Sequence, residues 1–126
     1  MALAVKHDLS IVRSAESRGG FEAVTTAYSY RILDHGGHEI LAYHWHPAGA
    51  SPVTRPHLHL SNRIQAITAD RGGGIVTLAE MHIPTGFVGT ADVVRLLITQ
   101  FGVEPKRQNW ADILEAAAPA QEGVRS

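Results

Sequence analysis

The sequence predicts an α+β fold, with an antiparallel β-sheet of about five strands packed against two C-terminal helices. Short runs rich in valine, threonine and aromatic residues fill the first part of the chain, and glycine and proline clusters separate them. Apolar residues at clear helical spacing occur near the C-terminus. The 126 residues fit one domain, residues 1–126, in which residues 119–126 form a frayed tail.

A hairpin around Gly36-Gly37 is the centre of the predicted sheet. The runs Val24–Leu33 and Ile40–His46 flank this dipeptide, and glycine supplies the positive φ that a two-residue turn needs. One face then carries the pairs Tyr28 with Trp45, Tyr30 with Tyr43, and Ile32 with Leu41. The opposite face carries Ala27 with His46, Ser29 with His44, and Arg31 with Ala42. The first face is therefore predicted to be core, and the second carries histidines.

Local sequence predicts the remaining elements. Strands are expected at Leu9–Ser14, Phe21–Leu33, Ile40–His46 and Pro56–Leu60, with a proline-rich loop over residues 47–56. A further hairpin is expected from Arg63–Ala69 and Ile75–Ile83, although Asn62–Ala69 also fits a helix. Helices are expected at Asp92–Phe101, with Thr90 as N-cap, and at Trp110–Ala118, with Asn109 as N-cap.

Composition excludes several classes of site and protein. The chain has no cysteine, which excludes disulfides, thiolate metal sites and a cysteine nucleophile, and which fits a cytoplasmic protein. No apolar run approaches the roughly 20 residues of a membrane span, so no membrane association is expected. The net charge is −1, so any binding of nucleic acid must use a local basic patch.

The histidines give the strongest functional signal. Six of the eight lie within residues 28–60, and four of these form the His-x-His pairs His44/His46 and His57/His59. Residues i and i+2 of a strand point to the same face, and the loop between the pairs can fold the second pair beside the first. Four neutral imidazoles suit zinc or another transition metal, and His82 is a candidate further ligand.

A second interpretation of the same residues requires no metal or other cofactor. In phosphodiester cleavage one imidazole accepts the 2′-hydroxyl proton, another protonates the leaving oxygen, and an arginine stabilises the phosphorane. Histidine suits both proton transfers because its ordinary pKa lies near neutral pH. The candidate catalytic residues for this reaction are His57, His59, His44, His46, Arg31, Arg55 and Arg63.

A family pattern also runs through residues 28–60. Its parts are Tyr28-Ser29-Tyr30, Asp34 with Gly37, Ile40–His46, and Pro56-His57-Leu58-His59. This pattern resembles the TumE-like family of small bacterial toxins from toxin–antitoxin loci, and related bacterial proteins. The chain departs from it at Ala42-Tyr43-His44, where the family typically has Arg-Tyr-Asp, and at Leu58, where the family typically has lysine. The resemblance implies an RNA-cleaving or translation-blocking toxin with an antitoxin as its partner.

Three functions follow from these observations. The leading hypothesis is a TumE-like toxin that acts on RNA through the histidine face and one of the three arginines. The first alternative is a transition-metal-binding module or metalloenzyme built on the two His-x-His pairs, and the second is a non-catalytic interaction protein. An apolar edge strand or the C-terminal helix also offers a surface for a homodimer.

Overall fold

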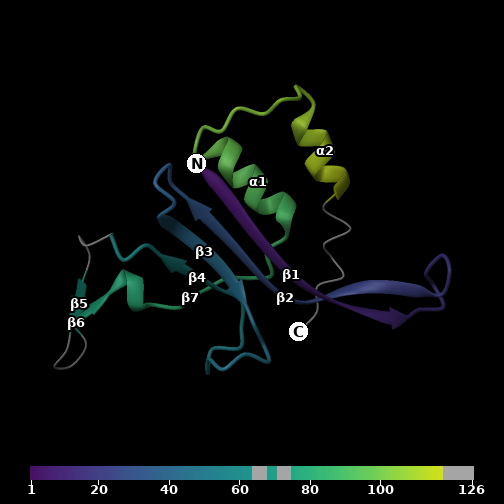
Figure 1. Cartoon of the computed structure of the whole chain (residues 1–126), viewed down its shortest axis with the longest axis horizontal. Coiled ribbons are helices and arrows are strands. Elements are labelled where there is room, and N and C mark those ends of the chain that lie inside the picture. The colour runs from purple at the N-terminus through teal and green to yellow at the C-terminus, as the bar shows by residue number, and fades with distance from the viewer. Residues whose placement is uncertain (64–67, 71–74, 118–126) are drawn as a thin grey trace. The chain divides into compact units, whose positions relative to one another are not determined.

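The computed structural model describes residues 1–63, 68–70 and 75–117. Five strands form one sheet in the order β1 (Ala2–Arg13), β2 (Phe21–Leu33), β3 (Glu39–Trp45), β4 (His57–Leu60) and β7 (Ile83–Pro84) (Figure 1). The pairs β2–β3, β3–β4 and β4–β7 are antiparallel. Two helices follow, α1 (Thr90–Thr99) and α2 (Trp110–Ala117). The predicted α+β class, with a five-stranded sheet and two C-terminal helices, is confirmed.

The chain divides into two compact units, Met1–Asp8 with Ala27–Gly86, and Leu9–Thr26 with Phe87–Ser126. The first unit carries β3, β4 and β7 and therefore all the candidate site residues. The single domain over residues 1–126 stays a prediction, and the frayed tail predicted at residues 119–126 lies outside the described residues. Within the described residues, neither helix combines the length and hydrophobicity that crossing a membrane requires.

Five of the six predicted pairs of the central hairpin are confirmed, and the sixth, Ala27 with His46, lies beyond the end of β3. The partners are Tyr28 and Trp45, Tyr30 and Tyr43, Ile32 and Leu41, Ser29 and His44, and Arg31 and Ala42. The aromatic face forms the core, because the exposed fractions of Tyr28, Tyr30, Ile32 and Trp45 are at most 1 %. The rings of Tyr28 and Trp45 lie 5.8 Å apart between centroids. This packing leaves the opposite face of the hairpin to carry the histidines.

The turn of this hairpin differs from the predicted two-residue turn. A bulge shifts the register after Ile32, and positive φ occurs at Gly37 (80°) but not at Gly36. The Gly37 amide donates to the Asp34 carbonyl at 3.1 Å. The Asp34 carboxylate accepts hydrogen bonds from the amides of His38 and Gly36, both at 2.9 Å. These hydrogen bonds lower the pKa of Asp34, and the bond from the His38 amide contributes most. They also give the amides of Gly36 and His38 an acceptor within the turn.

The first strand is longer than predicted. It begins at Ala2 rather than Leu9 and ends at Arg13. The ring nitrogen Nε2 of His7 lies 2.6 Å from the hydroxyl of Tyr30, which is fully buried. This hydrogen bond gives the early part of β1 a polar contact with the core face of β2.

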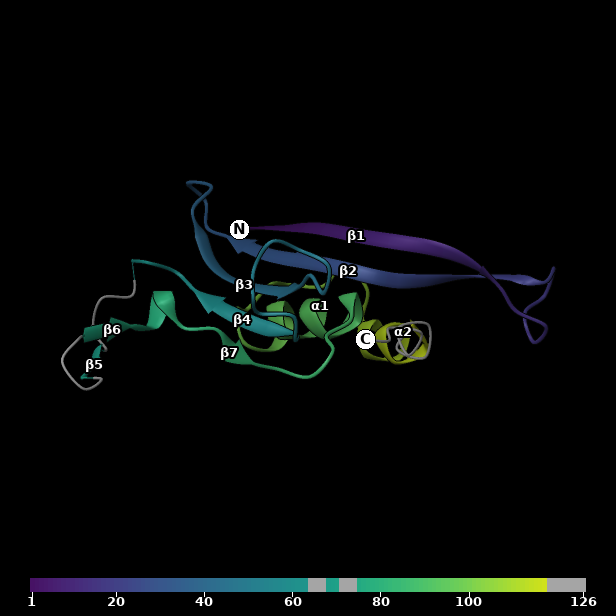
Figure 2. The same cartoon turned by 90° about the horizontal axis from the view of Figure 1, so that it is seen from below.

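The hairpin predicted after β4 from Arg63–Ala69 and Ile75–Ile83 is present, but its strands are shorter than predicted. The strands β5 (Thr68–Asp70) and β6 (Ile75–Thr77) form a separate two-stranded sheet and lead into the 3₁₀ helix η1 (Leu78–Glu80) (Figure 2). Residues 64–67 and 71–74 lie outside the described residues. Ile83–Pro84 joins β4 at the edge of the main sheet, a position that tolerates proline because an edge strand needs fewer donors.

The two helices have nearly the predicted bounds. The N-cap of α1 is Gly89, not Thr90, because the Asp92 carboxylate reaches back and accepts the Gly89 amide hydrogen bond at 2.8 Å. The helix buries Val93 and Leu97. An ion pair of 3.6 Å joins Arg95 of α1 to Glu115 of α2.

Candidate metal centre

The strands β3 and β4 bring the two His-x-His pairs together. In their antiparallel register His44 lies opposite His57, and His59 lies opposite Ala42. Residues opposite each other in a sheet point to the same face, so these imidazoles share the face opposite that of Tyr43 and Trp45. The loop of residues 47–56 returns the chain and makes this pairing.

Five imidazoles form one group, which we call the histidine cluster: His44, His46, His57, His59 and His82. Ring centroids of His44, His57 and His59 lie 4.9 to 5.8 Å apart. The ring of His46 lies 5.5 Å from that of His44. The ring of His82, just before β7, lies 4.6 Å from that of His59 and 5.1 Å from that of His57. The structure therefore gathers the four histidines of the two His-x-His pairs and the further candidate His82, while their roles stay predictions.

Three members of the histidine cluster present ligand atoms to a common point. One ring nitrogen from each of His44, His57 and His59 lies within 4.8 Å of the other two. Nitrogens bound to tetrahedral zinc at the usual bond length lie about 3.3 Å apart, so the three rings would have to move closer together to bind an ion. His57 is 5 % exposed, which limits its freedom and fixes one corner of the triangle.

A backbone hydrogen bond orients His57. Its Nδ1 lies 2.8 Å from the carbonyl oxygen of Arg55. A carbonyl only accepts, so Nδ1 carries the proton and Nε2 keeps its lone pair. Metal-binding histidines are commonly held in this way, with the second ring nitrogen donating to a carbonyl or carboxylate.

Burial and neighbouring imidazoles keep His44 and His59 neutral. Burial, with repulsion from the neighbouring His59, His46 and His57, lowers the pKa of His44 to about 4. Burial also lowers the pKa of His59, and the proximity of His57 and His82 adds to this effect. Both imidazoles are therefore unprotonated at neutral pH and have lone pairs available for a metal ion.

The lowered pKa of His44 predicts a loss of stability on mild acidification of the metal-free protein. Between pH 6.5 and about 4 the unfolded chain protonates His44 and the folded chain does not, so the free energy of unfolding falls as pH falls through this window. Because the side chain is only partly buried, we expect a loss of about 1–2 kcal/mol. Urea unfolding in chelator at about pH 7 and about pH 5 measures it. His44→Gln should show a smaller loss; an equal loss would contradict the assignment.

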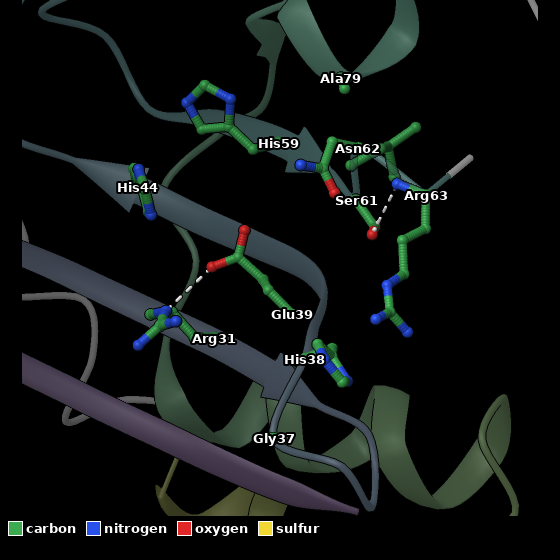
Figure 3. A pocket seen from close by; sticks show the side chains of 11 residues that line it. Arg31, Gly37, His38, Glu39, His44, His59, Ser61, Asn62, Arg63 and Ala79 are labelled. Atoms are coloured by element: carbon green, nitrogen blue, oxygen red, sulfur yellow. Dashed lines mark hydrogen bonds and ion pairs between the residues drawn. The ribbon is translucent and has the colours of Figure 1, made fainter. Parts of the chain in front are cut away.

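A cavity of about 580 Å³ opens beside the cluster (Figure 3). His44 and His59 form part of its wall, and Arg31, Glu39 and Arg63 contribute charged groups. The Arg31 Nε donates to Glu39 Oε1 at 2.9 Å. The volume is within the range of small-molecule sites.

The three candidate arginines have different surroundings. Arg31 and Arg63 line this cavity together with His44 and His59. Arg55 instead lines a second cavity of about 300 Å³, together with His57 and His82, and contributes its carbonyl to His57. Sequence reasoning missed Glu39. Its proximity to Arg31 arises only when β2 and β3 pair, and the predicted strand began one residue later, at Ile40.

Comparisons with known proteins give no relative: no family model, no curated protein and no solved structure matches the chain. The resemblance to TumE-like toxins therefore stays a prediction. The fold and the site together define the chain as a small α+β protein with a histidine cluster on one face of its sheet.

Proposed function

We propose that this protein binds a divalent transition metal through His44, His57 and His59. The observation that carries the proposal is the convergence of three ring nitrogens within 4.8 Å of one another. The orientation of His57 by the Arg55 carbonyl and the lowered pKa values of His44 and His59 also support it. A group of surface histidines that binds no metal requires neither the convergent nitrogens, nor the orientation of His57, nor the lowered pKa values.

The ligand set indicates the kind of metal. Three imidazoles without a carboxylate suit zinc, copper, nickel or iron, whereas magnesium and calcium prefer oxygen ligands. Three protein ligands also leave one position of a tetrahedral ion open, as in catalytic zinc sites. An ion in this position lowers the pKa of a bound water and supplies a nucleophile for hydrolysis or hydration. The cavity at His44 and His59 gives a substrate access to that position.

Metal-free RNA cleavage is the second candidate. The observation that favours it is the cavity itself, which combines two imidazoles with Arg31 and Arg63. Against it, the lowered pKa values of His44 and His59 leave both rings unprotonated near neutral pH, so neither is well suited to donate a proton to the leaving oxygen. We therefore place metal binding first.

Elemental analysis of the full chain, purified without a polyhistidine tag or a nickel column, tests the proposal. We expect about one zinc, copper, nickel or iron per chain, and about one zinc per chain after metal-free protein is dialysed against zinc. A protein that stays metal-free in both preparations would refute metal binding. RNA cleavage in excess chelator, lost in His59→Ala, would then favour the second candidate.

A further inference from the structure

We infer that the cavity beside His44 and His59 receives an oxyanion, a carboxylate or phosphate group carried by the substrate, with Arg63 as its protein partner. This inference rests on the proposed metal site, because the metal ion supplies part of the positive charge. It adds a substrate class to that site and assigns a binding role to Arg63.

The charges around the cavity favour an anion. Glu39 is its acidic group, and Arg31 compensates that charge across a bond of 2.9 Å. Arg63 lies on the same cavity with its side chain 62 % exposed. With a divalent ion at the three histidines, the positive charge exceeds the negative charge around the cavity, so an anionic group is attracted to it.

Arg63 is available for a ligand. Its guanidinium Nη1 lies 4.0 Å from Asp34 Oδ2, the limit of an ion pair. The other oxygen of Asp34 already accepts the amide hydrogen bonds of Gly36 and His38. An exposed pair of this length contributes little energy, so little is lost when Arg63 turns to an oxyanion. Guanidinium also matches the two oxygens of a carboxylate or phosphate group in a bidentate arrangement.

The backbone around Arg63 positions it on the cavity wall. The Arg63 amide donates to Ser61 Oγ at 3.1 Å, and the Ser61 amide donates to the Ile40 carbonyl of β3 at 2.9 Å. Ser61 is 9 % exposed, so this turn is anchored at the end of β4. The anchor keeps Arg63 on the same cavity as His59, two residues before Ser61 (Figure 3). The guanidinium-bearing Arg63 and two of the proposed metal ligands, His44 and His59, thus line one cavity.

Anion titration of the cobalt(II)-loaded full chain tests the inference, because visible cobalt absorption reports on the open coordination position. Inorganic phosphate and acetate are the oxyanion probes, and azide is the small anion that binds the metal without a guanidinium. We expect phosphate or acetate to shift the spectrum, and Arg63→Gln to weaken that oxyanion about tenfold while azide affinity changes less than about twofold. The stronger of the two oxyanions identifies the group.

Arg18→Gln is the matched control, since Arg18 is exposed in the turn between β1 and β2 and does not line the cavity. It should leave all three affinities unchanged. If phosphate and acetate leave the cobalt spectrum unchanged, the inference is overturned and the metal site is not. The same holds if Arg63→Gln weakens oxyanion and azide binding equally. A chain that takes up no cobalt at all refutes the metal site, and the inference with it.

Discussion

His59→Ala is expected to remove most of the stability that zinc gives to this protein. Zinc at about 100 times its Kd should raise the free energy of unfolding by about 2.7 kcal/mol if it binds the folded chain alone. Losing one of three ligands should weaken zinc binding more than about 100-fold, because losing even a group that hydrogen-bonds to a ligand weakens metal binding about 10–100-fold. At the same zinc concentration the variant then gains about 0.4 kcal/mol or less. Thermal unfolding with and without zinc measures both gains.

His35→Ala is the matched control for this experiment. His35 is an exposed histidine of the β2–β3 turn, outside the histidine cluster. It should keep the whole zinc-induced gain of the wild type. Equal gains in His59→Ala and His35→Ala would place the zinc elsewhere and refute the proposed centre.

Variants of His46 and His82, the two members of the histidine cluster outside the proposed ligand set, test which rings bind the metal. His46 contacts His44, and His82 contacts His57 and His59, but neither ring belongs to the group of three convergent nitrogens. We therefore expect His46→Ala and His82→Ala to keep stoichiometric zinc. Loss of zinc in His82→Ala would instead identify His82 as a fourth ligand and close the position that we assign to the substrate.

Trp45→Ala is expected to destabilise the protein by about 3–5 kcal/mol, the usual cost of truncating a large buried aromatic side chain. Trp45 is 1 % exposed and packs against Tyr28, so its removal leaves a cavity in the core of the first unit. Small domains are typically stable by about 5–15 kcal/mol, so this loss is a large part of the total. Urea unfolding of the metal-free protein measures the change.

Two variants show whether this effect comes from core packing. Trp45→Phe keeps an aromatic ring in place and should lose less than Trp45→Ala. Phe21→Ala removes a ring that is 56 % exposed and should change stability by less than about 1 kcal/mol. If Phe21→Ala and Trp45→Ala cost the same, the core face is not the one that the register of β2 and β3 defines.

The sequence by itself determined which residues share a face. Side chains alternate along a strand. Once the register is known, the aromatic and aliphatic pairs from Tyr28–Trp45 to Ile32–Leu41 must therefore lie on the face opposite to Arg31 and His44. The same alternation of side-chain direction places both members of each His-x-His pair on one side of its strand. The central hairpin, the core face and the candidate histidines were therefore predictable without long-range information.

The tertiary structure alone decided how these parts meet. The pairing of β3 with β4 sets His44 opposite His57, and the approach of β7 brings in His82. The Arg55 carbonyl, which orients His57, carries no signal in the residue type because every residue has a carbonyl. The cavity wall likewise joins Glu39 of β3 to Arg63 after β4. Such contacts depend on the path of loops and the packing of distant segments, and local periodicity does not encode either one.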